Sequence, residues 1–346
     1  MEKGLSNKTE YIYADYFRLI CAIGIVALHL DPFYDINEYV NFFIGSVLTR
    51  LCVPFFFLLS GFFLKDKLLN WGRLSKYVVY LIKLYSIYTI LYLPIVFYEF
   101  KDNGKSIGED ILDFIKKFLF VGSYGQLWYF LALIFAVVFL YLVKTKLALS
   151  DKMLTFVCII LYLIGLFFRV YDKPIRDTVD AIKIVALYDS VFKTTRNGLF
   201  FGVPFVFAGN MLWERGVLSN RRKCVALFWV SFLLLMSEAI FVRTIIGARQ
   251  LDMLLILPAT SILFVVLVLT KNIEATALKF TLSSWCRKLS VYIFGLHLLI
   301  FFFLSKVFKK VDFKASTLVM FTLVLVINFA IGIICIKIEN LYRKNN

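Results

Sequence analysis

The chain has 346 residues, of which 61% are hydrophobic, and a formal net charge of +16. Soluble domains contain roughly 45–50% apolar residues, and one soluble core could not cover so much apolar surface. The composition therefore excludes an ordinary soluble protein. Nucleic-acid binding is not expected either, because the basic residues fall mainly between apolar runs, where loops meet anionic lipid headgroups.

Ten apolar runs predict an all-α membrane protein of about ten transmembrane helices, since roughly 20 apolar residues make one span. The predicted spans are residues 13–30, 42–64, 78–98, 126–143, 153–169, 198–212, 224–242, 252–270, 289–305 and 316–338. The sixth is short. We expect no removable signal peptide and one transmembrane domain over residues 1–346, with no appended soluble domain.

The loop charges indicate the orientation. An even number of spans places both termini on one side, and the loops on the N-terminal side carry the larger share of Lys and Arg. The first loop on the other side holds Asp31, Asp35 and Glu38 and no basic residue. The distribution predicts cytoplasmic N- and C-termini.

Two connections on the predicted outer side are long and amphipathic. In residues 107–120, one helical face holds Ile107, Ile111, Ile115 and Phe118. Such a pattern predicts an interfacial helix lying on the membrane. Residues 174–195 have a similar character. A helix resting on the bilayer and a lid over an outer site both remain open for these segments.

The six cysteines are scattered through the chain, with no C-x-x-C pair and no histidine at ligand spacing. They are Cys21, Cys52, Cys158, Cys224, Cys286 and Cys335. This distribution is typical of small apolar packing residues and predicts neither a metal site nor a disulfide framework.

Arg18 and His29 share the first predicted span. Ionisable groups inside a span are expensive, so each is a functional candidate. Eleven residues of helix turn through three turns plus about 20°, which places both side chains on one face, roughly 16 Å apart along the axis. An arginine can hold an anion and a neutral imidazole can take a proton. Snorkelling of Arg18 and a locally hydrogen-bonded His29 are the structural alternatives.

A second charged set lies near the predicted outer ends of the spans. Its members are Arg50, Arg196, Glu238, Arg243 and Asp252. Glu238 stands out because it lies inside a span, five residues before Arg243, which is imperfect spacing for a pair on one helix. A basic residue from another span is an equally good partner, and a purely structural ion pair stays open.

His297, near the middle of the ninth predicted span, is the chain's second and last histidine. Its apolar surroundings favour a buried, hydrogen-bonded residue or a cavity wall over a second base.

Four stretches together resemble the acyltransferase-3 family of bacterial membrane proteins. YADYFRLICAIGIVALHLDPF, with ten residues between Arg18 and His29, is similar to its first helix. RLCVPFFFLLSGFFL, which contains Phe57, Ser60 and Gly61, is similar to its second. GQLWYFLALIFA, with Trp128 and Tyr129, resembles its fourth, and VYIFGLHLLI resembles its late histidine helix. The resemblance covers nearly the whole chain in order.

Two further stretches resemble one branch, the membrane half of vancomycin-resistance serine racemases. They are RNGLFFGVPFVFAGNM and SEAIFVRTIIGARQLDM. That resemblance implies L-serine entry for a fused pyridoxal-phosphate domain, although we expect no racemase domain to accompany this chain.

The family resemblance implies a multi-pass enzyme of the bacterial cell membrane that moves an acetyl or other short acyl group. The donor would be cytosolic acyl-CoA, with no tightly bound cofactor, and the acceptor a hydroxyl of a cell-surface glycan or lipid-linked sugar. His29 and Arg18 would be catalytic. The other candidates would bind substrate, namely Arg50, Ser60, Trp128, Tyr129, Arg196, Glu238, Arg243, Asp252 and His297.

A small amino-acid transporter is the alternative, because Arg196 or Arg243 could hold a carboxylate while Glu238 or Asp252 holds an ammonium group. A non-catalytic membrane subunit is the third option. The sequence carries no sign of a protein partner.

Overall fold

The computed structural model describes residues 11–101, 104, 106–171, 194–214, 220–248, 250–270 and 276–345. All regular secondary structure within these ranges is helical, as the apolar runs predict. Eight helices are long and apolar enough to cross a membrane. The predicted spans at 198–212 and 252–270 form shorter apolar helices, Gly198–Trp213 and Leu257–Leu269.

The chain divides into two compact units. The first consists of Met1–Phe56, Val217–Cys224 and Phe264–Asn346, and the second of Phe57–Gly216 and Val225–Leu263. Three helices, α4 (Cys52–Leu64), α11 (Arg221–Phe241) and α12 (Leu257–Leu269), have residues in both units. The single-domain organisation stays a prediction.

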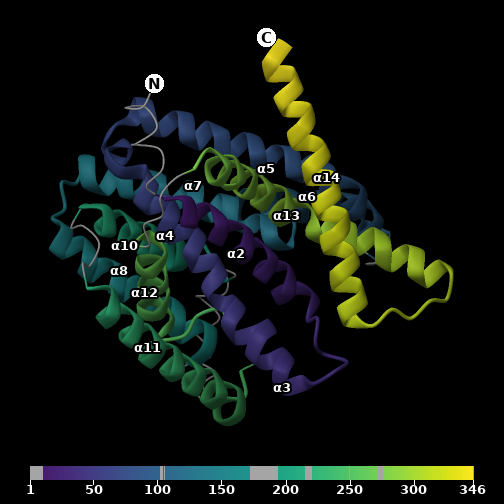
Figure 1. The fold of residues 1–346 in the computed structure, drawn as a ribbon, viewed down its shortest axis with the longest axis horizontal. Coiled ribbons are helices and arrows are strands. Elements are labelled where there is room, and N and C mark those ends of the chain that lie inside the picture. The colour runs from purple at the N-terminus through teal and green to yellow at the C-terminus, as the bar shows by residue number, and fades with distance from the viewer. Residues whose placement is uncertain are drawn as a thin grey trace. The chain divides into compact units, whose positions relative to one another are not determined.

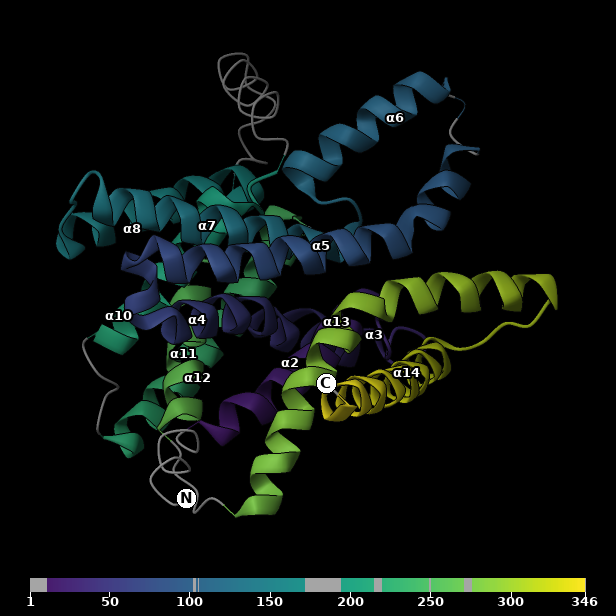
Figure 2. The ribbon, with the colours of Figure 1, turned by 90° about the horizontal axis from the view of Figure 1, so that it is seen from above.

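The first unit is built around α2 (Ile12–Leu30), α13 (Ala277–Lys310) and α14 (Thr317–Asn345). Helix α2 packs along α13, and α14 packs against both. Figure 1 shows α14, in yellow, beside α13, and Figure 2 shows that α13 is bent. After α2 the chain continues through α3 (Glu38–Val40), the π-helix η1 (Asn41–Val47) and the 3₁₀ turn η2 (Leu48–Leu51).

Helix α13 is much longer than the predicted span 289–305. Thr276 caps its N-terminus by accepting a hydrogen bond from the Lys279 amide, and such a cap satisfies an otherwise unpaired donor. Two lysines, Lys309 and Lys310, lie in its last turn, where positive charge is favourable. The apolar pattern predicted only the middle of this helix, because polar and apolar residues are mixed in its first three turns.

In the second unit, α4 is followed by the 3₁₀ turn η3 (Lys65–Leu69), and α5 (Trp71–Phe100) then packs against α7 (Trp128–Thr145). The other elements are α8 (Asp151–Leu166) with its π-helical continuation η6 (Phe167–Tyr171), η8 (Gly198–Gly202), α10 (Val203–Glu214) and η9 (Val242–Ile246). Helix α10 contacts α7 and α8.

The predicted amphipathic segment forms α6 (Ile107–Lys116), which continues as η4 (Lys117–Val121) and precedes the 3₁₀ turn η5 (Gly125–Leu127). Ser106 and Glu109 form a capping box at its start. Ile107, on the apolar face, is 75% exposed, as expected of a helix that rests on lipid. Figure 2 shows α5 and α6 as a hairpin. The second predicted interfacial segment, 174–195, lies outside the described residues except for Thr194 and Thr195.

Candidate functional site

A charged cluster joins the start of α2 to the second and third turns of α13 in the first unit. The Asp15 carboxylate, whose side chain is 9% exposed, forms an ion pair with Arg18. It also accepts a hydrogen bond of 2.7 Å from the Ser283 hydroxyl, and Arg287 lies 3.4 Å away. Two guanidinium groups share one carboxylate, so the cluster has a net positive charge that can attract an anion.

The two histidines come together farther along the same pair of helices. Helices α2 and α13 run in the same direction, because Asp15 contacts Ser283 near their starts and His29 lies beside His297 further on. The imidazole ring centroids are 5.2 Å apart with an interplanar angle of 31°. His297 is fully buried and His29 is half-buried. Nothing in the sequence spacing predicted that these two rings would be neighbours.

Arg50 belongs to the first unit as well, at the end of η2. It is half-buried, and its Nε donates to the Ser46 carbonyl oxygen at 3.0 Å. This bond runs back along its own helical segment and fixes the direction of the side chain.

In the second unit, Ser60 and Gly61 serve different purposes. The Ser60 hydroxyl lies 3.4 Å from the Tyr129 hydroxyl on α7, so these two predicted residues are joined. Gly61 faces the backbone of α10, and a Cβ at this position would overlap the Val206 carbonyl. The glycine is therefore required for close helix packing, as small residues often are between membrane helices.

Arg196, Trp128 and Asp252 form a second group in this unit. The Arg196 guanidinium lies over the Trp128 ring, 5.0 Å from its centroid, a favourable cation–π contact. Its Nη1 is 3.8 Å from Asp252, whose carboxylate also pairs with Arg169. Asp252 is thus held between two arginines.

The Glu238 carboxylate accepts hydrogen bonds from the segment before α12. The Leu255 and Ile256 amides donate to it at 2.5 and 2.9 Å, and the Tyr171 hydroxyl donates at 2.8 Å. These contacts show a carboxylate that secures a loop and a helix start. Arg243 lies in η9 and is exposed.

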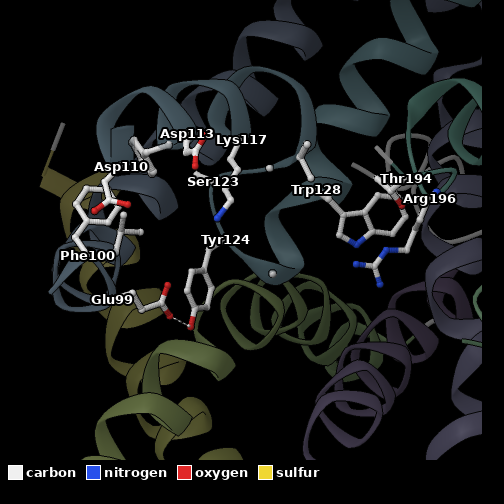
Figure 3. Close-up of a pocket in the computed structure, with 15 residues that line it drawn as sticks. Glu99, Phe100, Asp110, Asp113, Lys117, Ser123, Tyr124, Trp128, Thr194 and Arg196 are labelled. Carbon is white, nitrogen blue, oxygen red and sulfur yellow. Dashed lines mark hydrogen bonds between the residues drawn. The ribbon is translucent and has the colours of Figure 1, made fainter. Parts of the chain in front are cut away.

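A cavity of about 380 Å³ lies between the ends of α5, α6 and α7 in the second unit (Figure 3). Its charged lining is divided. Glu99, Asp110 and Asp113 lie toward one end, whereas Arg196 and Trp128 lie toward the other. Tyr124 and Lys117 occupy the middle. The cavity could therefore hold a ligand with groups of opposite charge, or a polyol against an aromatic ring.

Sequence reasoning missed several members of these groups. Asp15 stands three residues before Arg18, a spacing that places two side chains together on a helix. Arg169 lies near the end of a predicted span and was detectable as an ionisable residue in an apolar run. Ser283 and Arg287 carried no such signal, because their role depends on how α13 packs.

Metal binding has no candidate among the described ranges, where no group of three or more His, Cys, Asp or Glu side chains could hold an ion.

Comparison with known proteins identifies the family. A family model described as an acyltransferase domain, acyltransferase-3, matches residues 11–337. An amino-acid racemase of Enterococcus faecalis is 28% identical over 341 residues, which are 95% of this chain and 46% of that protein. A second amino-acid racemase of that organism is 32% identical over 214 residues, 60% of this chain and 29% of the relative.

A serine/alanine racemase of Enterococcus gallinarum is 28% identical over 93% of this chain and 45% of its own length. The chain thus spans less than half the length of these relatives. No solved structure matches. Because the family model covers the chain from residue 11 to residue 337, the chain belongs to the acyltransferase-3 family.

Proposed function

We propose that this protein is a membrane O-acyltransferase that moves an acetyl or other short acyl group from acyl-CoA to a hydroxyl of a glycan or lipid-linked sugar. One observation carries the proposal. The parallel helices α2 and α13 hold two arginines near one end and two histidines farther along.

This arrangement fits the two ends of an acyl-CoA donor. Arg18 and His29 are separated by roughly 16 Å along α2. The phosphates of the donor would bind at Arg18 and Arg287, and the extended pantetheine arm would bring the thioester to His29. With the predicted cytoplasmic N-terminus, the arginine end faces the cytosolic donor.

The reaction needs a base, because a sugar hydroxyl is a poor nucleophile. His29 takes the hydroxyl proton as the oxygen attacks the thioester carbonyl carbon. The tetrahedral intermediate then collapses, the carbon–sulfur bond breaks, and the CoA thiolate receives the proton. A substrate-binding role for Arg50, which lies in the same unit as His29, belongs to this proposal, since a guanidinium donor can stabilise an oxyanion. The substrate-binding roles of Ser60 and Tyr129 stay predictions.

The direct test supplies labelled acetyl-CoA to purified protein in liposomes that contain lipid-linked glycans. We expect label on the glycan, and none when the donor is omitted. Labelled acceptor that forms equally well without protein, or label that stays in the CoA fraction, would contradict the proposal.

A second candidate function is transport of a small amino acid, and the cavity of the second unit favours it. A zwitterion requires a cation for its carboxylate and an anion for its ammonium group. Arg196 and the Glu99 end of the cavity provide both. The racemase relatives, one of them named for serine and alanine, point to the same substrate class.

Uptake of labelled L-serine into proteoliposomes tests this candidate. Transport predicts uptake that Arg196→Ala removes and that Arg73→Ala, a matched change at an exposed arginine of the same unit, leaves intact. The acyltransferase proposal predicts no uptake above that of empty liposomes.

A further inference from the structure

His29 and His297 are the only histidines in the chain, and they are neighbours within the first unit. His297 lies on α13 among apolar side chains, with the Phe294 ring 6.4 Å from its own ring. The pair is therefore well suited to a test of how one imidazole affects the other.

The hydrogen-bond partners of His297 determine which nitrogen carries its hydrogen. Its Nδ1 lies 3.1 Å from the Ile293 carbonyl oxygen and 2.9 Å from that of Phe294. Carbonyl oxygens only accept hydrogen bonds, so Nδ1 must donate. A neutral imidazole with its hydrogen on Nδ1 has a lone pair at Nε2.

That lone pair is buried. Nε2 has no hydrogen-bond partner within the described part of the chain. A buried acceptor left without a donor destabilises the folded protein, and such groups in native proteins often mark a functional position. The His29 ring is beside it, and a centroid separation of 5.2 Å allows facing ring nitrogens to approach to about 2.9 Å, the distance of an N–H···N bond.

We propose that His297 is a positioning residue for His29. Its Nε2 accepts the N–H of His29, so the lone pair of His29 is held on the other nitrogen, toward the acceptor hydroxyl. This inference rests on the proposed function, in which His29 is the base. The described rotamer does not make the bond, and a rotation of the half-buried His29 side chain forms it.

The arrangement also stabilises the protonated base. When His29 takes the hydroxyl proton, its imidazolium continues to donate to Nε2 of His297. His297 in turn donates from Nδ1 to two carbonyl oxygens. The positive charge is thereby shared along a hydrogen-bonded chain that ends at the backbone of α13, until the proton passes to the departing thiolate.

Selective ¹⁵N-histidine labelling tests the inference, because only two residues give signals. In the wild type we expect His297 protonated at Nδ1 and His29 in one tautomer, with a coupling across an N–H···N bond. In His297→Met, which removes the acceptor, His29 should become a tautomer mixture. His29→Ala is the matched control, because the two carbonyls should keep His297 protonated at Nδ1.

Turnover gives the second readout. His297→Met should lower kcat at least tenfold, as expected when a base loses the group that fixes its tautomer, and leave KM for acyl-CoA within about twofold. His297→Gln can present an amide oxygen near the position of Nε2, so it should recover part of kcat. A purely structural role predicts losses that follow thermal stability in both variants.

The inference is overturned if wild-type His297 carries its hydrogen on Nε2, or if the tautomer of His29 is the same in the wild type and in His297→Met. The wild-type spectrum decides the first point even if a variant does not fold. Absence of acyl transfer by the wild type would contradict the proposed function alone, since the tautomers are measured without substrate.

Discussion

Glu238 in the second unit and His297 in the first are both polar side chains on helices apolar enough to span a membrane, yet their surroundings differ. Glu238 receives two backbone amides and one tyrosine hydroxyl. His297 has a donating nitrogen held by two carbonyls and an accepting nitrogen without a partner in the described residues.

The difference separates structural from catalytic candidates. A carboxylate whose oxygens already accept three hydrogen bonds stabilises the loop that supplies them and has little capacity left for a substrate. A buried nitrogen with an unused lone pair can still accept a hydrogen bond, as proposed for the N–H of His29. The first unit is therefore the better candidate for the reaction site, and the following substitutions test that contrast.

The largest effect is expected from His29→Ala. A positioned base contributes on the order of 10²–10⁴-fold to a reaction of this kind, so acyl transfer to the glycan should fall by about that factor. Ser305→Ala is a matched control, since its hydroxyl donates to the Phe301 carbonyl of its own helix. Full activity of His29→Ala in the labelled-donor assay would remove the base from the mechanism.

Glu238→Gln should instead reduce stability. Hydrogen bonds to a charged acceptor contribute about 1.5–3 kcal/mol each, and an amide cannot replace the carboxylate toward three donors. We expect a clear fall in Tm in detergent. Ser237→Ala, at the exposed neighbouring position, should leave Tm nearly unchanged. Strong serine uptake by the wild type, lost in Glu238→Gln at unchanged Tm, would show that the carboxylate binds substrate.

A smaller effect is expected from Arg18→Lys. Lysine keeps the charge but loses the planar fork of the guanidinium group, so KM for acyl-CoA should rise about tenfold, or about 1.4 kcal/mol of binding. Arg221→Lys is the control, because Arg221 donates to the Leu267 carbonyl and not to the Asp15 carboxylate. Equal KM values in the two variants would exclude Arg18 from donor binding.

Single-cysteine variants that map the orientation should have the smallest effect on activity. In a cysteine-free background, Ser150→Cys and Asn220→Cys should react only with reagents that reach the cytoplasm, and Asn37→Cys only with reagents added outside. Asp189→Cys should also react from outside, although residue 189 lies beyond the described ranges. Reversed labelling at any two positions would reverse the predicted orientation and place the Arg18 end away from cytosolic acyl-CoA.

Much of the fold was predictable from the chain alone, because a bilayer requires long apolar helices and the sequence displays them directly. The short helices Gly198–Trp213 and Leu257–Leu269 were predicted as apolar runs. The first agrees with its predicted span to within one residue, whereas the second begins at Leu257 and not at residue 252, because the apolar residues 253–256 before the helix resemble the rest of a span.

The sequence by itself determined the helical membrane class and the shared face of Arg18 and His29, since helical periodicity relates residues close together in the chain. Only the tertiary structure decided that Asp15 is shared with Arg287, that His29 meets His297, and that Glu238 binds backbone amides. Those partners are 17 to 272 residues apart in sequence, and no local pattern encodes which helices pack together. The direction of the Nδ1 bond of His297, and hence its unused lone pair, likewise depends on the folded backbone of α13.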